Sequence, residues 1–119
     1  MARILVADDA VFMRMVVSEA IARAGHEVVG EARDGVEAVA RYEELRPDAV
    51  TLDITMPEKD GLTALADIMA ADPSARVVMC SALGQESKAL QAMRLGAKDF
   101  IVKPFAPERV ARALATALA

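Results

Sequence analysis

The sequence has few aromatic residues and almost no cysteine. One tyrosine and three phenylalanines are its only aromatic residues, and tryptophan is absent. Because 55% of the residues are hydrophobic, the core must be built from aliphatic side chains, and we expect the seven methionines to fill gaps in it. The single cysteine, Cys80, excludes an internal disulfide and is typical of a reducing cytoplasm. We expect Cys80 to be a small buried apolar residue.

Long hydrophobic runs and an excess of positive charge are also missing. The longest uncharged stretch, 77–85, is far shorter than the roughly 18 apolar residues of a membrane helix. The N-terminal MARILVADDA has too short an apolar part for a signal peptide, and acids follow it at once. A net charge of −4 argues against binding to a phosphate backbone. The sequence therefore predicts a cytoplasmic chain that binds neither membranes nor nucleic acid directly.

Short apolar runs alternate with longer amphipathic segments along the 119 residues, a length that suits one domain over 1–119. The short apolar runs predict strands. The amphipathic segments predict helices, several of which end just before a Gly or a Pro. Asp34 is a predicted helix cap. The predicted strands are 4–7, 27–32, 49–52, 76–80 and 100–102, and the predicted helices are 11–24, about 35–46, 61–71, 85–95 and 107–119.

Functional side chains follow four of the five predicted strands. Alternating strands and helices indicate an α/β fold, with a parallel sheet covered on both faces and right-handed crossovers. Such sheets bind ligands beyond the carboxyl ends of their strands. The first strand is followed by Asp8 and Asp9, the third by Asp53, the fourth by Ser81 and the fifth by Lys103. We therefore expect three acids, a hydroxyl and an ammonium group at one edge of the sheet.

Three neighbouring carboxylates repel one another, and a hard divalent cation removes that conflict. An all-oxygen ligand set with few protein donors favours Mg²⁺, with Mn²⁺ as a substitute. Lys103 can neutralise a phosphoryl oxygen, and Ser81 can donate a hydrogen bond to another. These groups suit phosphoryl transfer, in which positioning and charge stabilisation matter most. A carboxylate acceptor would form an aspartyl phosphate.

Each of these residues alone also has an ordinary structural interpretation. An acid pair after a strand is commonly a helix cap, and so is a lone serine such as Ser81. Asp53 alone is as compatible with a loop as with a site, and Lys103 alone is typical of a surface charge. The joint placement at four strand ends favours the functional interpretation.

Four segments carry a resemblance to the response regulator receiver family of two-component signalling. They are VADDA at 6–10, LDITMPEKDG at 52–61, SA at 81–82 and KPF at 103–105. Together, in this order, they are highly specific, and the resemblance runs from Ile4 to the end of the chain. It implies a flavodoxin-like, doubly wound sheet of five parallel strands in the order 2-1-3-4-5, with five helices.

The resemblance assigns roles around the acids. Asp53 matches the phosphoacceptor and also contacts the metal, Asp9 matches a direct metal ligand, and Asp8 matches the acid that holds a metal-bound water. Thr55 would bind the metal through its backbone carbonyl. Thr55 and Leu83 match positions near the path of the attacking water, and we hypothesise that the apolar Leu83 slows hydrolysis by excluding water.

The resemblance also assigns the parts that read the phosphoryl group. Ser81 matches the switch hydroxyl, and Lys103 matches the phosphate-binding lysine. Phe100 matches the aromatic switch position, although it lacks the hydroxyl group of a tyrosine. The peptide bond between Lys103 and Pro104 is expected to be cis.

The implied function is a phosphorylation-activated switch rather than an enzyme. A histidine kinase or phosphotransfer domain would donate a phosphoryl group to Asp53. The surface formed by 85–95, 100–102 and the last helix would then repack to control partner binding. Slow self-catalysed dephosphorylation would reset the switch. We expect a stand-alone, chemotaxis-type regulator, monomeric or weakly dimeric, with a flagellar motor switch as a possible target. The alternative is a receiver fragment of a longer regulator with a DNA-binding or enzymatic output domain.

Two rival classes of function, a hydrolase and a binding module, fit the sequence less well. A phosphatase-type hydrolase would have a DxD motif and a cap domain, whereas Asp8 and Asp9 are adjacent and no residues remain for a cap. A flavin-binding domain would need aromatic residues in its loops, and a degenerate receiver used only for docking would have lost some of the acids or the lysine.

Overall fold

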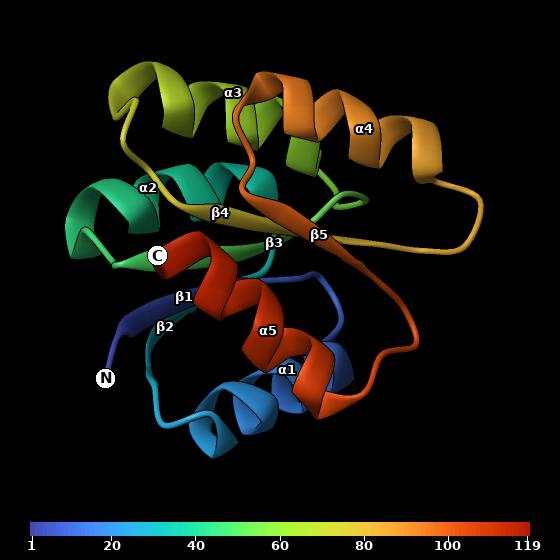
Figure 1. Cartoon of the computed structure of the whole chain (residues 1–119). Helices are drawn as coiled ribbons and strands as arrows, with labels where there is room; N and C mark the ends of the chain where they lie inside the picture. The colour runs from blue at the N-terminus through green and yellow to red at the C-terminus, as the bar shows by residue number, and fades with distance from the viewer.

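The computed structural model describes residues 1–119 and alternates strands with helices along the chain (Figure 1). The strands are β1 (Arg3–Ala7), β2 (Glu27–Ala32), β3 (Ala49–Asp53), β4 (Val77–Ser81) and β5 (Asp99–Val102). The helices are α1 (Val11–Arg23), α2 (Gly35–Leu45), α3 (Gly61–Ala71), α4 (Glu86–Leu95) and α5 (Pro107–Leu118). The strands are parallel in the order β2-β1-β3-β4-β5, which confirms the predicted fold class and strand order. None of the helices is both long and apolar enough to cross a membrane.

The sheet lies between two helical layers, with α2, α3 and α4 on one face and α1 and α5 on the other (Figure 1). Each face has its own hydrophobic cluster, of 18 buried residues under α2, α3 and α4 and of 14 under α1 and α5. The central strands β3 and β4 are buried along their whole length, including their polar residues Thr51, Asp53 and Ser81. The sheet is thus a fixed platform for the groups at its carboxyl edge.

Local capping explains where several helices begin and end. The side chain of Asp34 accepts a hydrogen bond from the Glu37 amide at 2.8 Å, so the predicted cap of α2 is confirmed. Asp60 caps α3 in the same way through the Thr63 amide at 2.8 Å. The helix α4 ends at Leu95, and the following Gly96 has a φ of 114°, in the left-handed region that favours glycine.

Two sequence-based expectations need correction. Ser81 belongs to β4 rather than following it, because its carbonyl accepts a hydrogen bond from the Lys103 amide at 2.8 Å and extends the ladder. The expectation that methionines fill the core is wrong for Met1, Met15 and Met93, which are 91%, 64% and 37% exposed, although Met56 and Met79 are buried. Cys80 is buried as expected, and burial raises the pKa of its thiol to about 12.

The strand β5 forms one edge of the sheet, and side chains cover part of that edge. The Phe100 amide donates to the carboxylate of Asp99 at 2.8 Å, and Arg109 of α5 donates to the Phe100 carbonyl at 2.9 Å. Arg109 also pairs with Asp99 at 3.3 Å, which closes a ring of polar contacts. Both backbone groups of Phe100 therefore have partners without another strand.

Candidate metal centre

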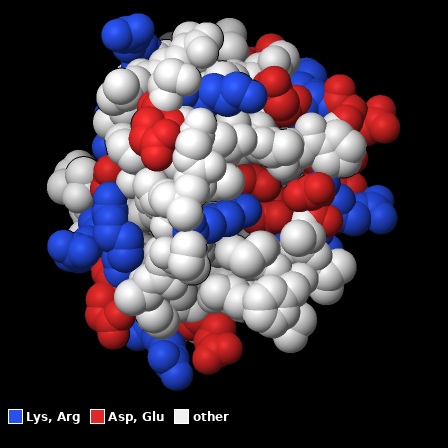
Figure 2. Space-filling model, turned by 90° about the vertical axis from the view of Figure 1, so that its right-hand side faces the viewer, with Lys and Arg blue, Asp and Glu red and all other residues white.

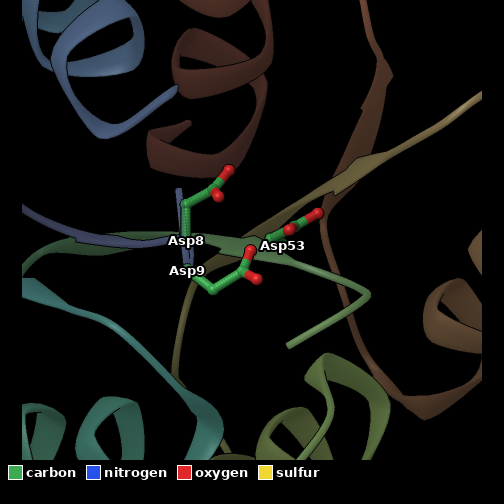
Figure 3. Close-up of side chains that lie close together, drawn as sticks. All are labelled: Asp8, Asp9 and Asp53. Carbon is green, nitrogen blue, oxygen red and sulfur yellow. The ribbon is translucent and has the colours of Figure 1, made fainter. Parts of the chain in front are cut away.

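The carboxylates of Asp8, Asp9 and Asp53 meet at the carboxyl edge of the sheet. Each offers an oxygen, and these oxygens lie within 4.8 Å of one another. In Figure 3, Asp9 and Asp53 point toward a common space from the ends of β1 and β3, with Asp8 beside them. Figure 2 shows acidic side chains gathered on this face next to a basic one. Asp8 and Asp53 are buried and Asp9 is exposed, so the cluster is open to solvent on one side.

Arg14 fixes the backbone that carries the acid pair. Its guanidinium donates to the Asp8 carbonyl at 2.8 Å and to the carboxylate of Glu31 at 2.9 Å. The side chain of Asp8 accepts from the Ala10 amide at 2.9 Å, and α1 has no side-chain cap, so the acid pair is not a helix cap. Arg14 was not among the site residues predicted from the sequence. Its spacing from Val17, three residues on along the buried side of α1, is the signal that could have found it.

Gly61 allows the first turn of α3 to lie directly against Asp53. A Cβ atom at position 61 would stand 2.0 Å from the Asp53 carbonyl oxygen. The Gly61 amide donates to the Ile54 carbonyl at 2.7 Å, which ties the loop after β3 to the start of α3. Any other residue at position 61 would displace the backbone of Asp53.

Lys103 reaches back from the end of β5 to the acids. Its ammonium nitrogen lies 3.0 Å from Asp8 Oδ2 and 3.2 Å from Asp53 Oδ1, and its side chain is only 21% exposed. It is therefore not a solvated surface charge. Burial opposes the charged form of Lys103, but the hydrogen bond to Asp8 and the charges of Asp53 and Asp8 outweigh it, so the pKa of Lys103 is raised. The peptide bond between Lys103 and Pro104 is cis.

The electrostatics of the cluster fit a divalent cation. Burial and the nearby charge of Asp8 raise the pKa of Asp53 to about 6, and Asp9 adds to this rise, whereas Lys103 opposes it. One ammonium group thus compensates only part of the charge of three carboxylates. An all-oxygen cluster with this excess of negative charge suits Mg²⁺. Asp8, Asp9 and Asp53 are the side chains that can hold it.

The remaining predicted site residues, Ser81, Phe100, Leu83 and Thr55, make their contacts outside the three carboxylates. The Ser81 hydroxyl is buried and donates to the Ile101 carbonyl at 3.4 Å. Phe100 is half-buried and packs against the larger hydrophobic cluster. Leu83 is 75% exposed in the loop after β4. Thr55 is exposed, and its hydroxyl accepts a hydrogen bond at 2.7 Å from Gln85, a residue that the sequence analysis did not single out.

Comparisons with known proteins agree with this geometry. Residues 4–115 match the family model of the response regulator receiver domain. The chain is 55% identical over 112 residues to the "Chemotaxis protein CheY" of Thermotoga maritima, covering 94% of this chain and 93% of that protein. It is 57% identical over 114 residues to the protein of the same name from Listeria monocytogenes, covering 96% of each.

A solved structure gives the same result in three dimensions. The CheX–CheY–BeF₃–Mg²⁺ complex from Borrelia burgdorferi contains a chain that matches with a TM-score of 0.93 and 39% identity, covering 98% of this chain and 89% of that chain. The present chain therefore belongs to the response regulator receiver family, whose members are signalling switches of two-component systems rather than conventional enzymes. Within this family it is similar to the chemotaxis regulators.

Proposed function

We propose that this chain is a phosphorylation-activated switch that accepts a phosphoryl group on Asp53 from the phosphohistidine of a histidine kinase or phosphotransfer domain. The observation that carries the proposal is the meeting of Asp8, Asp9, Asp53 and Lys103 at one sheet edge. The side chains of Asp8, Asp9 and Asp53, with the backbone carbonyl of Thr55, are the proposed holders of Mg²⁺, or of Mn²⁺ in its place. The bound cation would offset the repulsion between the carboxylates and the anionic donor.

The chain's own groups then carry the transfer. An Asp53 carboxylate oxygen attacks the phosphorus, the nitrogen–phosphorus bond of the donor breaks, and the imidazole leaves with the electron pair. Lys103 lies 3.2 Å from Asp53 and can pair with a phosphoryl oxygen without a large movement. Hydrolysis of the acyl phosphate by water resets the switch, and we expect Thr55 and Leu83 to tune that rate.

The readout begins at Ser81. In the unphosphorylated chain its hydroxyl donates a long hydrogen bond of 3.4 Å to the Ile101 carbonyl. A charged phosphoryl oxygen on Asp53 is a stronger acceptor and can take over this donor. A turn of Ser81 toward Asp53 opens space beside β5 for Phe100. The surface of α4, β5 and α5 then changes its affinity for a downstream protein. A pocket of about 400 Å³ lies on this surface, lined by residues of β5, of α5 and of the loop between them, which include Phe100 and Arg109.

An apolar surface beside the site provides a place for the phosphodonor. Phe12 and Met15 on α1 are 71% and 64% exposed. Phe12 also lines a groove of about 310 Å³, together with Lys103 and Phe105. Because Lys103 belongs to both the groove and the carboxylate cluster, a helical partner seated on the groove would bring its histidine to Asp53. Exposed apolar patches of this kind mark protein interaction sites.

The remaining features of the proposal concern context. We propose a cytoplasmic, monomeric or weakly dimeric regulator whose downstream target is a protein such as a flagellar motor switch. A receiver within a longer regulator is the alternative. The similar CheY structure from Borrelia burgdorferi carries BeF₃, Mg²⁺ and a CheX partner, which supports a phosphoryl-responsive site and recognition by protein contact.

Titration with Mg²⁺ and beryllium fluoride, followed by NMR, tests the proposed function. Chemical shift changes are expected to spread from Asp53 to Phe100 and α4, and to vanish in Asp53→Asn. Asp48→Asn is a matched control, because Asp48 binds the Arg3 amide at 2.7 Å and takes no part in the carboxylate cluster. The proposal is wrong if the wild-type spectrum does not respond or if Asp53→Asn responds equally.

A further inference from the structure

The side chain of Gln85 links the two loops that border the carboxylate cluster. Its Oε1 accepts a hydrogen bond from the Ala82 amide at 2.8 Å, in the loop after β4. Its Nε2 donates to the Thr55 hydroxyl at 2.7 Å, in the loop after β3. Gln85 is also the N-cap residue of α4, yet its side chain caps no amide of that helix. Both ends of the amide group are therefore used to hold the loops together.

The Ala82 amide is a donor that the sheet leaves free. The Ile54 amide donates to the Cys80 carbonyl at 3.1 Å, and in a continuing parallel ladder the next bond would run from the Ala82 amide to the Ile54 carbonyl. The Ile54 carbonyl instead accepts from the Gly61 amide at 2.7 Å. The Ala82 amide thus stands at the splayed ends of β3 and β4, bonded to a side chain that can move.

We propose that Gln85 is a latch of the unphosphorylated state, which holds the Ala82 amide until a phosphoryl group on Asp53 takes that donor. Asp53 pairs in register with Cys80, so Ala82 lies only two residues beyond the partner of the phosphoacceptor. A charged phosphoryl oxygen is a stronger acceptor than a neutral amide oxygen, so the exchange is favourable once the group is present. This inference rests on the proposed function of Asp53.

Release of the latch has two consequences. Gln85 loses the bond that fixes its side chain, and the link between the loops at Thr55 weakens with it. Because Gln85 is the N-cap residue of α4, the start of that helix loses its side-chain link to the loop after β4 when the site is occupied. The latch lowers the affinity of the site for a phosphoryl group, since one hydrogen bond must break for each group bound.

Binding of beryllium fluoride in the presence of saturating Mg²⁺ measures the latch in the full chain. Gln85→Met removes both polar groups and keeps a side chain of similar length. We expect its apparent affinity for beryllium fluoride to rise about 2- to 10-fold, the equivalent of one hydrogen bond no longer broken. Gln91→Met is the matched control, because Gln91 is exposed on the same helix and its side chain forms no hydrogen bond in this structure.

Two further measurements separate a latch from a purely structural brace. Ala82 is an exposed residue, so in Gln85→Met its amide should exchange with solvent faster before beryllium fluoride is added and be equally protected afterwards. Thr55→Val removes the hydroxyl that accepts the other hydrogen bond of Gln85. This substitution should change the affinity for beryllium fluoride less in the Gln85→Met background than in the wild type. A brace predicts a lower affinity for beryllium fluoride in Gln85→Met, because the loops lose order.

An equal or lower affinity in a folded Gln85→Met protein overturns the latch. The proposed function stands even in that case if the wild type binds beryllium fluoride and Asp53→Asn does not. If the wild type shows no binding that depends on Asp53, the proposed function itself is wrong and the latch falls with it. Urea unfolding of each variant establishes that it is folded before the titration.

Discussion

The charge of Asp53 should destabilise the metal-free fold at neutral pH. Burial and the charge of Asp8 raise its pKa from an ordinary 3.8 to about 6 in the folded chain. At about 1.36 kcal/mol per pKa unit, that difference corresponds to roughly 3 kcal/mol. Because the folded state holds the Asp53 proton more tightly than the unfolded state, the loss of stability is absent below about pH 4 and complete above about pH 6.

Asp53→Asn removes this pH-dependent penalty. The variant keeps the contact of Lys103 with Asp8 at 3.0 Å but loses the contact with Asp53 at 3.2 Å, so the net gain is smaller than the full penalty. We expect Asp53→Asn to be more stable than the wild type by about 1–3 kcal/mol at pH 8 without metal, and by little at pH 4. Urea unfolding in EDTA across this pH range measures the difference.

Added Mg²⁺ should narrow the difference in stability between the two proteins. At a concentration of 100 times its dissociation constant, a ligand of the folded state stabilises it by about 2.7 kcal/mol, and Asp53→Asn should gain less because it lacks one carboxylate. Parallel pH profiles for the wild type and Asp53→Asn without metal would refute the electrostatic reasoning. A Mg²⁺ effect of the same size in both would refute the assignment of Asp53 as a ligand.

Three further substitutions test the packing and the chemistry. Gly61→Ala places a Cβ atom against the backbone of Asp53, so it should cost about 1–3 kcal/mol in urea unfolding and weaken Mg²⁺ binding. Its control is Gly25→Ala, in open space at a φ of 87°, which should cost about 1–2 kcal/mol and leave Mg²⁺ binding intact. Leu83→Glu should speed the loss of the phosphoryl group, and an unchanged dephosphorylation rate would refute the water-exclusion hypothesis. Tyr42→Phe loses a hydrogen bond of 2.7 Å to Asp72 far from the site, so it should cost about 1 kcal/mol without changing beryllium fluoride binding.

The carboxylate cluster could be predicted from sequence because strand topology alone sets it. Once buried apolar runs are assigned as parallel strands, the residues that follow them must share one edge, and Asp8, Asp53 and Lys103 are brought together whatever the side-chain details. The helix limits followed from local chemistry in the same way, as the cap at Asp34 and the stop at Gly96 illustrate.

Contacts between loops could not be predicted in this way. Gln85 bonds to a hydroxyl thirty positions earlier in the chain, and nothing near it in sequence indicates that partner. Arg14 had a weak local signal, its place on the buried side of α1, but its two acceptors come from β2 and from the end of β1. Such bonds depend on how elements meet in space, whereas periodicity reports only which side of one element faces the core.

The polar ring of Asp99, Arg109 and Phe100 determines how other proteins can approach this side of the sheet. An exposed edge strand normally invites another strand to extend the sheet. Here an incoming backbone would first have to break the bonds to the Phe100 amide and carbonyl and separate an ion pair. An approaching protein therefore meets the side chains of Asp99 and Arg109 before it can reach the backbone of Phe100.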